Sequence, residues 1–225
     1  MKILFEDNHI IVIEKPIGVP SQSDLNKTKS ITDMLSEHLK SKGEESKIYV
    51  LHRLDRNVGG VMVYAKTKLA ASEISKQIQS GIFQKEYLAV IHSKPETDEG
   101  VLEDLLFKDS SKNKTFVVKR VRKGVKKAKL SYKLLESIES EYGELSLIRV
   151  HLYTGRTHQI RVQFASRKMP LFGDVKYGSK DNNEKIGLYS CSISFVHPQS
   201  KKEMSFERMP TDTPFDRFTK STNEY

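Results

Sequence analysis

The stretch LHRLDRNVGG (residues 51–60) sets one carboxylate, Asp55, between two arginines and close to a histidine. Apolar segments flank it on both sides, KIYV before it and VMVYAK after it, and both are typical of strands. The sequence therefore predicts a charged loop between two buried strands. A salt-bridged loop would satisfy this pattern, and so would a carboxylate that is held ready for chemistry.

The composition is that of a soluble globular protein. Of the 225 residues, 37% are apolar and 30% are charged, and this length can bury a substantial core. No stretch approaches the ~20 apolar residues that span a bilayer, and the first residues lack the features of a secretory signal. Cys191 is the one cysteine, which excludes an intrachain disulfide and a cysteine-based metal cluster. We expect a cytoplasmic protein in which Cys191 is buried.

The net charge of +9 favours a polyanionic partner, nucleic acid first and an anionic membrane surface second. The charge is concentrated between Lys112 and Lys129, which hold nine Lys or Arg residues and no Asp or Glu. A basic hairpin that is merely solvated explains this segment as well as a nucleic-acid contact does.

Strand-like segments are spread along the chain, with hairpins expected near both ends, at residues 3–15 and 187–209. About nine strands and three helices, without a regular alternation of the two, predict an α+β protein. We expect a mostly antiparallel mixed sheet, flanked by helices and loops, with an active-site cleft across it. No linker rich in Pro, Gly or Ser divides the chain, so residues 1–225 are expected to form one domain.

Two helices have clear capping signals. Ser30 with Asp33 forms a capping box before the first helix, which ends before a glycine. Thr67 caps a second helix over residues 68–80, which Gly81 ends. In this second helix we expect the apolar positions to be Leu69, Ile74 and Ile78.

A third helix is expected in HQIRVQFAS, residues 158–166. Ile160, Val162 and Phe164 fit the alternation of a strand, but Ile160 and Phe164 also share one helical face. With Thr157 as a possible N-cap, we favour the helix.

Three features carry chemistry. An Asp side chain is ionised at neutral pH, a nearby Arg keeps it so, and in a dry cleft Asp55 could act as a nucleophile or a base. In LYTGRTHQIRVQF, Arg156, His158 and Arg161 gather at the start of the third helix, where backbone N–H groups favour an anion. Tyr87, in the strand-like QKEYLAV, offers a flat face for a base. Taken singly, each has an ordinary structural explanation.

Taken in order, these motifs resemble the RluA family of RNA pseudouridine synthases. The resemblance rests on HRLD, GGVMVYAKT, KEYLAV, TGRTHQIR and PLFGDVKYG, with IIVIEKPIGVPSQ before them, and spans roughly residues 3 to 208. Many relatives have Ser-Gly where this chain has Gly59-Gly60, a difference that affects loop conformation rather than chemistry. Many also carry a small N-terminal RNA-binding domain, which we do not expect here because the resemblance begins at about residue 3.

The resemblance implies a role for each site residue. Asp55 would be the catalytic aspartate, Arg161 its ion-pair partner, and Tyr87 the ring that stacks on the target base. Leu152 would pack against the base or the aspartate. The remaining predicted site residues would bind the RNA backbone or the space that the flipped nucleotide vacates: Arg53, Arg156 and His158.

The implied reaction isomerises uridine to pseudouridine in ribosomal or transfer RNA, with no cofactor and no metal, by a protein that we expect to be a monomer. Three roles for Asp55 stay open: attack on C1′ of the sugar, attack on the base, or removal of a sugar proton. The alternative is a non-catalytic RNA-binding or ribosome-assembly protein of the same fold. A glycoside hydrolase is disfavoured because it normally needs two carboxylates, and the motifs supply one.

Overall fold

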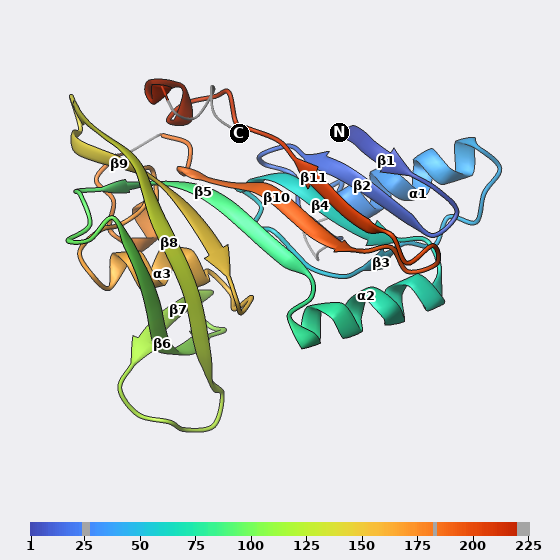
Figure 1. Ribbon diagram of the computed structural model, residues 1–225, viewed down its shortest axis with the longest axis horizontal. Coiled ribbons are helices and arrows are strands. Elements are labelled where there is room, and N and C mark those ends of the chain that lie inside the picture. Colours follow the sequence, from blue (N-terminus) through green and yellow to red (C-terminus); the bar gives the residue numbers. More distant parts are fainter. Residues whose placement is uncertain (24–27, 182–183, 220–225) are drawn as a thin grey trace. The chain divides into compact units, whose positions relative to one another are not determined.

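The computed structural model describes residues 1–23, 28–181 and 184–219. Within these ranges it contains eleven strands and three α-helices (Figure 1), which confirms the predicted α+β class. The chain divides into two compact units: residues 1–85 with 190–208, and residues 86–189 with the chain after 208. Each unit is described by itself. None of the described helices combines the length and the apolar character needed to cross a membrane.

The first unit contains the strand order β1-β2-β4-β10, with β3 paired to β4 and β11 paired to β10. The predicted terminal hairpins are both present, because β1 pairs antiparallel with β2 and β10 with β11. The strand expected at IYVLH is only two residues long. The strands are β1 Lys2–Glu6, β2 Ile10–Lys15, β3 Tyr49–Val50, β4 Gly59–Ala65, β10 Leu188–Val196, which begins in the second unit, and β11 Glu203–Glu207.

The two helices of this unit begin and end where their caps predict. In α1 (Ile31–Ser41), Ser30 and Asp33 form the expected capping box. In α2 (Lys68–Ser80), Thr67 accepts a hydrogen bond from the third helical residue, and Gly81 takes the left-handed conformation that ends the helix. Short-range side-chain chemistry therefore defines both helices without help from the rest of the chain.

The apolar face of α2 differs from the expected one. Leu69 is 59% exposed, so its assignment to the core is wrong, whereas Ala70 and Ile74 are buried against the sheet. The spacing of four between Ala70, Ile74 and Ile78 keeps these residues on one face, and Leu69 lies about 100° away from it. Small Ala70 lets the helix approach β4 closely. The core there is completed from β10, and Cys191 on that strand is buried as expected.

The second unit contains the strand order β5-β9-β8-β6-β7, and all four pairings along it are antiparallel. The strands are β5 Gln84–His92, whose first two residues belong to the first unit, β6 Glu99–Asp109, β7 Lys114–Val118, β8 Val125–Ser140 and β9 Gly143–Leu152. The third predicted helix is α3 (Gln159–Ala165), and two 3-10 turns follow, η1 Val175–Tyr177 and η2 Phe215–Arg217.

The strand β6 was not predicted, and it changes the interpretation of the basic segment. The segment from Lys112 to Lys129 is not a single hairpin, because β7 pairs with one edge of β6 and β8 pairs with the other. The connection of residues 119–124 must therefore cross β6, and Arg122 lies over the ring of Phe107 at 4.6 Å. On the opposite face, α3 packs its apolar side against β6 and β8.

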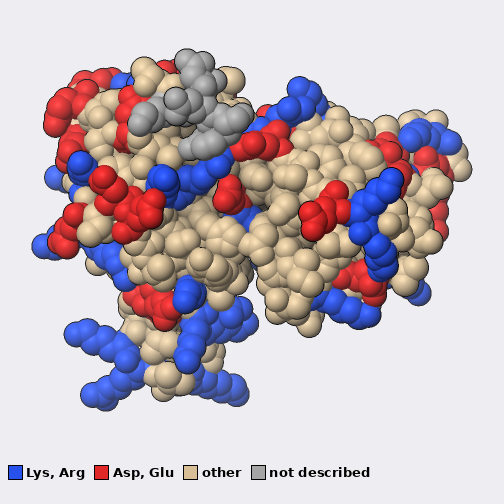
Figure 2. Space-filling model, viewed as in Figure 1, with Lys and Arg blue, Asp and Glu red and all other residues tan. Residues whose placement is uncertain are grey.

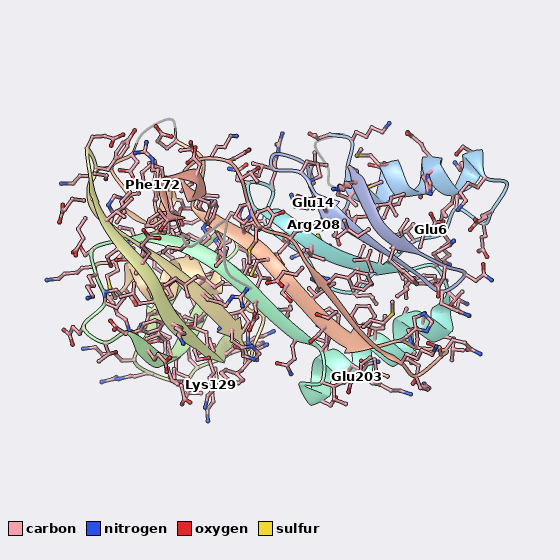
Figure 3. The ribbon with its side chains drawn as sticks, turned by 45° about the horizontal axis from the view of Figure 1, so that its top comes forward. Glu6, Glu14, Lys129, Phe172, Glu203 and Arg208 are labelled. Atoms are coloured by element: carbon pink, nitrogen blue, oxygen red, sulfur yellow. The ribbon has the colours of Figure 1, made fainter. Side chains whose placement is uncertain are left out.

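An ion cluster ties the start of the first unit together. The Glu6 carboxylate (Figure 3) lies 2.8 Å from Nε2 of His38, 2.8 Å from Nζ of Lys42 and 3.1 Å from Nζ of the buried Lys66. Burial acts to raise the pKa of Glu6, but the hydrogen bonds from Lys42, His38 and Lys66 outweigh it and lower this pKa to about 2. The cluster joins β1, α1 and the end of β4.

We predict that Glu6→Gln destabilises the protein by on the order of 1 kcal/mol at pH 7, about 2–4 °C in Tm. The pKa of Glu6 is lowered by folding, so its stabilisation is present above about pH 4.5 and is lost as the pH falls toward 2. The difference in Tm from wild type should therefore shrink across this range. Thermal melts at pH 7, 5, 3 and 2 check it, with the exposed Glu37→Gln as control. A difference that is equal at every pH would contradict the assignment.

Candidate active site

The loop that carries Asp55 is fastened to the first unit by its backbone. Ser21 Oγ donates to the carbonyl of Leu54 (2.8 Å) and accepts from the Leu54 N–H (3.1 Å), and Leu54 is buried. The N–H of Val58 donates to the carbonyl of Asp55 (3.0 Å) and closes a turn. Asp55 itself is half-buried between these anchors. The predicted loop between β3 and β4 is therefore rigidly held, with its carboxylate partly accessible.

A buried cation, Lys15, lies beneath this loop and was not recognised as a site residue from the sequence. It is 1% exposed, and its Nζ donates to the carbonyls of Pro16 (2.9 Å), Val19 (2.7 Å) and Arg56 (3.2 Å). Burial lowers the pKa of Lys15 to about 8, and the charge of Asp55 opposes this effect. The one available signal was a lysine before a proline, at the end of a strand, IIVIEK, whose first four residues are apolar.

Not every basic side chain near Asp55 in LHRLDRNVGG carries the charge or the exposure that the sequence suggests. His52 is not a cation: burial, with the charge of Lys85, lowers its pKa to about 3, and its Nε2 accepts from the N–H of Val63 (3.2 Å). Arg53 is exposed. Arg56 donates from Nε to the carbonyl of Gly18 (2.9 Å) and so ties the two loops together. His52 is thus a packing residue, whereas Arg53 and Arg56 are both exposed, with Arg56 anchored at its Nε.

Gly60 is required at the start of β4. Its φ is +121°, and a Cβ there would collide with the backbone of Ser190 on β10. An L side chain would be excluded both by the conformation and by this close approach. The second glycine of the pair after the loop is therefore set by packing in the first unit.

In the second unit, the sheet brings two of the predicted residues to one face. Tyr87 on β5 is directly opposite Val150 on β9, and Leu152 is two residues further along β9. Residues i and i+2 of a strand share a face, so Tyr87 and Leu152 do too. Both are largely buried, at 6% and 8% exposure. A ring and an aliphatic side chain are thus held side by side by strand pairing.

The loop TGRTH between β9 and α3 is organised by Gln159, which the sequence did not single out. Its Oε1 accepts from Thr154 Oγ1 (2.8 Å) and from the N–H of Arg156 (3.0 Å), and its Nε2 donates to the carbonyl of Lys129 (3.1 Å). The predicted cap at Thr157 is wrong: the N-cap is His158, in the left-handed conformation with φ +53° and without a side-chain cap. The hydrogen bonds of the buried Gln159 amide therefore hold this loop in place of a side-chain cap.

His158 and Arg156 each have a fixed partner. Nδ1 of His158 lies 2.8 Å from the hydroxyl of Tyr177, which also accepts from the N–H of Thr115 (2.9 Å). Burial raises the pKa of Tyr177 above its usual value. Arg156 is exposed and donates from Nε to the carbonyl of Lys127 (3.0 Å). Arg156 is therefore anchored at its Nε although its side chain is exposed.

Arg161 is held by an acid that the sequence analysis did not assign. Its Nε and Nη2 each donate to one oxygen of Asp174, both at 2.7 Å, and Asp174 is 2% exposed. The guanidinium also lies 5.0 Å from the ring centre of Tyr177. Asp174 lies in the motif PLFGDVKYG, but the family resemblance implied no role for this residue. The pairing of Arg161 with Asp55 stays a prediction.

Each unit therefore contains some of the residues that the sequence predicts for the site. The first holds a partly accessible carboxylate near a buried lysine. The second holds a buried tyrosine, a leucine beside it, and an arginine fixed by a bidentate ion pair. Such groups suit reaction at a sugar or a base of a nucleic acid, with charge control by fixed cations.

The family model for RNA pseudouridylate synthases matches residues 9–166. The chain is 34% identical over 201 residues to an uncharacterised RNA pseudouridine synthase, YhcT, of Bacillus subtilis, with 88% of this chain and 65% of that protein covered. It is 29% identical to ribosomal large subunit pseudouridine synthase C of Buchnera aphidicola subsp. Acyrthosiphon pisum, with 96% of this chain and 69% of that protein covered.

Solved structures agree on the fold. Human RNA pseudouridylate synthase domain containing 4 superposes with a TM-score of 0.74 at 24% identity, over 93% of this chain and 88% of that one. These similarities define a fold shared with RNA-modifying enzymes. The chain belongs to the RNA pseudouridylate synthase family, as the RluA-like motifs predicted. It spans about two thirds of the length of the curated relatives named above.

We predict that Asp174→Ala and Arg161→Ala each lower the free energy of unfolding by about 3–5 kcal/mol, because each breaks a buried ion pair from one side. Urea unfolding measures the loss. Lys185→Ala is the control, since its ion pair with Asp212 is exposed and should be worth less than about 0.5 kcal/mol. An Asp174→Ala protein as stable as wild type would show that the pair contributes nothing to the fold.

Proposed function

We propose that this protein is an RNA pseudouridine synthase, an isomerase that converts uridine in RNA to pseudouridine. The family match across residues 9–166 carries the proposal, because Asp55, Tyr87, Leu152 and Arg161 all fall within it. The anchored loop that presents Asp55 and the strand pairing that presents Tyr87 support the same conclusion.

The reaction breaks the bond from N1 of uracil to C1′ of ribose and forms a bond from C5 to C1′. C5 then loses its proton, N1 gains one, and no atom is added overall. Asp55 is the reacting carboxylate in this proposal, by attack on C1′, by attack on the base, or by removal of a sugar proton. A carboxylate must be ionised for each of these steps, and nearby cations favour that form.

Two cations are proposed to keep Asp55 ionised. Arg161 is the partner that the family resemblance implies, and its bidentate contact with Asp174 holds its guanidinium in one orientation. Lys15 is the second, because it is a buried cation whose Nζ donates to the carbonyl of Arg56, the residue after Asp55. Because these two cations are already held in place, they do not have to reorient during the reaction, as water molecules would.

The target nucleotide must leave the base stack before the glycosidic bond can react. We propose that Tyr87 stacks on the extruded uracil and that Leu152 closes the same pocket from the neighbouring strand. Arg53, Arg156 and His158 are proposed to bind the flanking phosphates or to occupy the space that the nucleotide leaves. The exposure of Arg53 and Arg156 suits them for phosphate contact.

Ribosomal RNA is the substrate that we propose first, since two relatives are named ribosomal large subunit pseudouridine synthases C and D. Transfer RNA is the alternative substrate. We further propose that the protein acts as a monomer in the cytoplasm. Mapping of pseudouridine in total RNA from cells with and without the gene would identify the target.

A non-catalytic RNA-binding protein of the same fold is the second candidate function. The strong positive charge of the segment between Lys112 and Lys129 would serve binding alone equally well. The two functions differ at Asp55, since binding alone needs no carboxylate beside Lys15.

We predict that Asp55→Asn lowers the rate of pseudouridine formation by roughly a thousandfold or more, while folding and RNA affinity stay close to wild type. Asn keeps the size of the side chain but supplies no anionic oxygen. Because C5 loses its hydrogen, release of tritium from RNA that contains 5-tritiated uridine measures the rate. Asp212→Asn, at an exposed acid, is the control. Activity within tenfold of wild type would reject Asp55 as the reacting group, and a wild-type protein without activity on any RNA would favour the binding function.

A second prediction concerns the connection that crosses β6. Replacing Lys119, Arg120, Arg122 and Lys123 with Gln should weaken RNA binding and flatten its dependence on salt, by about 0.7 to 0.9 in log–log slope per lost phosphate contact. The single-turnover rate at saturating RNA should change little. Binding titrations at several salt concentrations test this, with Lys201→Gln and Lys202→Gln in the first unit as controls. An unchanged slope would make the segment a solvated surface, and a collapsed rate at normal affinity would place it in the active site.

A further inference from the structure

The strand register of the second unit creates a sheet face that points away from α3. Directly opposite residues of paired antiparallel strands share a face. Glu103 on β6 is opposite Lys129 on β8, and the N–H of Tyr153, just after β9, donates to the carbonyl of Lys129. Two rows further along β6, Phe107 is opposite Phe116 on β7. We call this surface the open face. It includes Glu103, Phe107, Phe116, Lys127, Lys129 and Tyr153.

The two faces of this part of the sheet differ in burial. On the face toward α3, Leu102, Leu106, Ala128 and Leu130 are at most 8% exposed. On the open face no member is buried, and the residues that alternate with the buried ones along β6 and β8 are half-buried or exposed. Among the described residues, no helix packs on the open face as α3 packs on the other. The connection of residues 119–124 crosses β6 on this face, with Arg122 and Gly124 near the ring of Phe107.

Aromatic side chains on the open face are exposed to an unusual degree. Tyr153 is 55% exposed and Phe116 is 37% exposed. In the described part of the chain, these are the two aromatic residues among the exposed large hydrophobic side chains. Exposed rings cost free energy of hydration, and their grouping on one surface marks it as a contact surface.

Each ring on this face has a cation near it. Nζ of Lys129 lies 5.5 Å from the ring centre of Tyr153, Nζ of Lys114 lies 5.9 Å from that of Phe116, and the guanidinium of Arg122 lies 4.6 Å from that of Phe107. Figure 2 shows blue side chains spread over the end of the second unit that holds β6, β7 and the start of β8. Flat rings and cations therefore alternate over one surface.

This combination matches the chemistry of single-stranded nucleic acid. Unpaired bases stack on aromatic rings, and the phosphates between them meet Lys and Arg. A duplex offers phosphates but keeps its bases stacked inside, so it would not use Tyr153 and Phe116. Three acids of β6 share this face, and each is opposite a lysine: Glu99 with Lys133, Glu103 with Lys129 and Asp109 with Lys114. Glu103 pairs with Lys129 at 2.7 Å, and every charged residue from Lys112 to Lys129 is positive.

We propose that the open face binds a single-stranded RNA segment that flanks the modified uridine, with bases stacked on Tyr153 and Phe116 and phosphates on the lysines between them. This proposal rests on the proposed function, which requires an RNA substrate. From Tyr153 to Phe116 the surface extends across three strand spacings and two rows, about 20 Å by sheet geometry. That length accommodates a segment of at least about four nucleotides, the lower end of known single-strand sites. Lys127 and Lys129 lie along this path on β8.

The test uses a fluorescein-labelled 12-residue oligoadenylate, which contains no uridine and so measures binding apart from the reaction. Tyr153→Ala and Phe116→Ala should each weaken binding by about 5- to 100-fold. Tyr153→Phe keeps the ring and should bind within twofold of wild type. The salt slope should stay unchanged in all three variants, because stacking releases no counterions. The same oligomer annealed to its complement should bind more weakly to wild type and should not respond to Tyr153→Ala.

The control is Leu69→Ala, which removes an equally exposed apolar side chain from the first unit and should have no effect. Binding by both alanine variants at the wild-type level, or duplex binding as tight as single-strand binding, would overturn the proposal. Loss of a concentration-dependent dimer in Tyr153→Ala, seen by sedimentation without a change in oligoadenylate affinity, would instead make the face a self-association surface. Failure of the proposed function shows up separately, as absence of tritium release by wild type.

Discussion

The second unit depends on one buried ion pair. Arg161 in α3 and Asp174 in the turn before η1 are joined by two hydrogen bonds of 2.7 Å, and Tyr177 lies against the same guanidinium. The hydroxyl of Tyr177 in turn reaches the backbone of β7 and the ring of His158. A guanidinium buried this deeply is tolerated only with such complete pairing. The pair therefore fixes α3, the loop before it and the edge of the sheet as one body.

The position of α3 determines what each face of that sheet can do. Because the helix covers the face that carries Leu102, Leu106 and Ala128, those positions become core. The same register leaves Tyr153, Lys129 and Phe116 on the other face, where no described helix covers them. Tyr87 and Leu152 lie on the core side of this sheet, opposite to the face that we propose to bind RNA.

In the first unit, the decisive constraint is the cost of burying charge. Lys15 ends an apolar strand, yet three carbonyl oxygens satisfy its ammonium group, and the loop that carries Asp55 contributes one of them. Ser21 Oγ donates to the Leu54 carbonyl of the same loop, and the loop's Arg56 donates from its side-chain Nε to the carbonyl of Gly18. The carboxylate of Asp55 is therefore placed by hydrogen bonds to the backbone of its loop, and His52, which looks like a charged neighbour, is neutral and structural.

By itself, the sequence determined the features that depend on local chemistry. The capping residues set the bounds of α1 and α2, the alternation of apolar residues located most strands, and the ordered motifs identified the family. It did not reveal β6, the exposure of Leu69, or the N-cap at His158, since each depends on what packs against it. Likewise Lys15, Gln159 and Asp174 each have a partner that is distant along the chain: Arg56, Lys129 and Arg161. Their hydrogen bonds and burial exist only after folding, so only the tertiary structure decided which charged and polar residues build the site and which face of the sheet stays open.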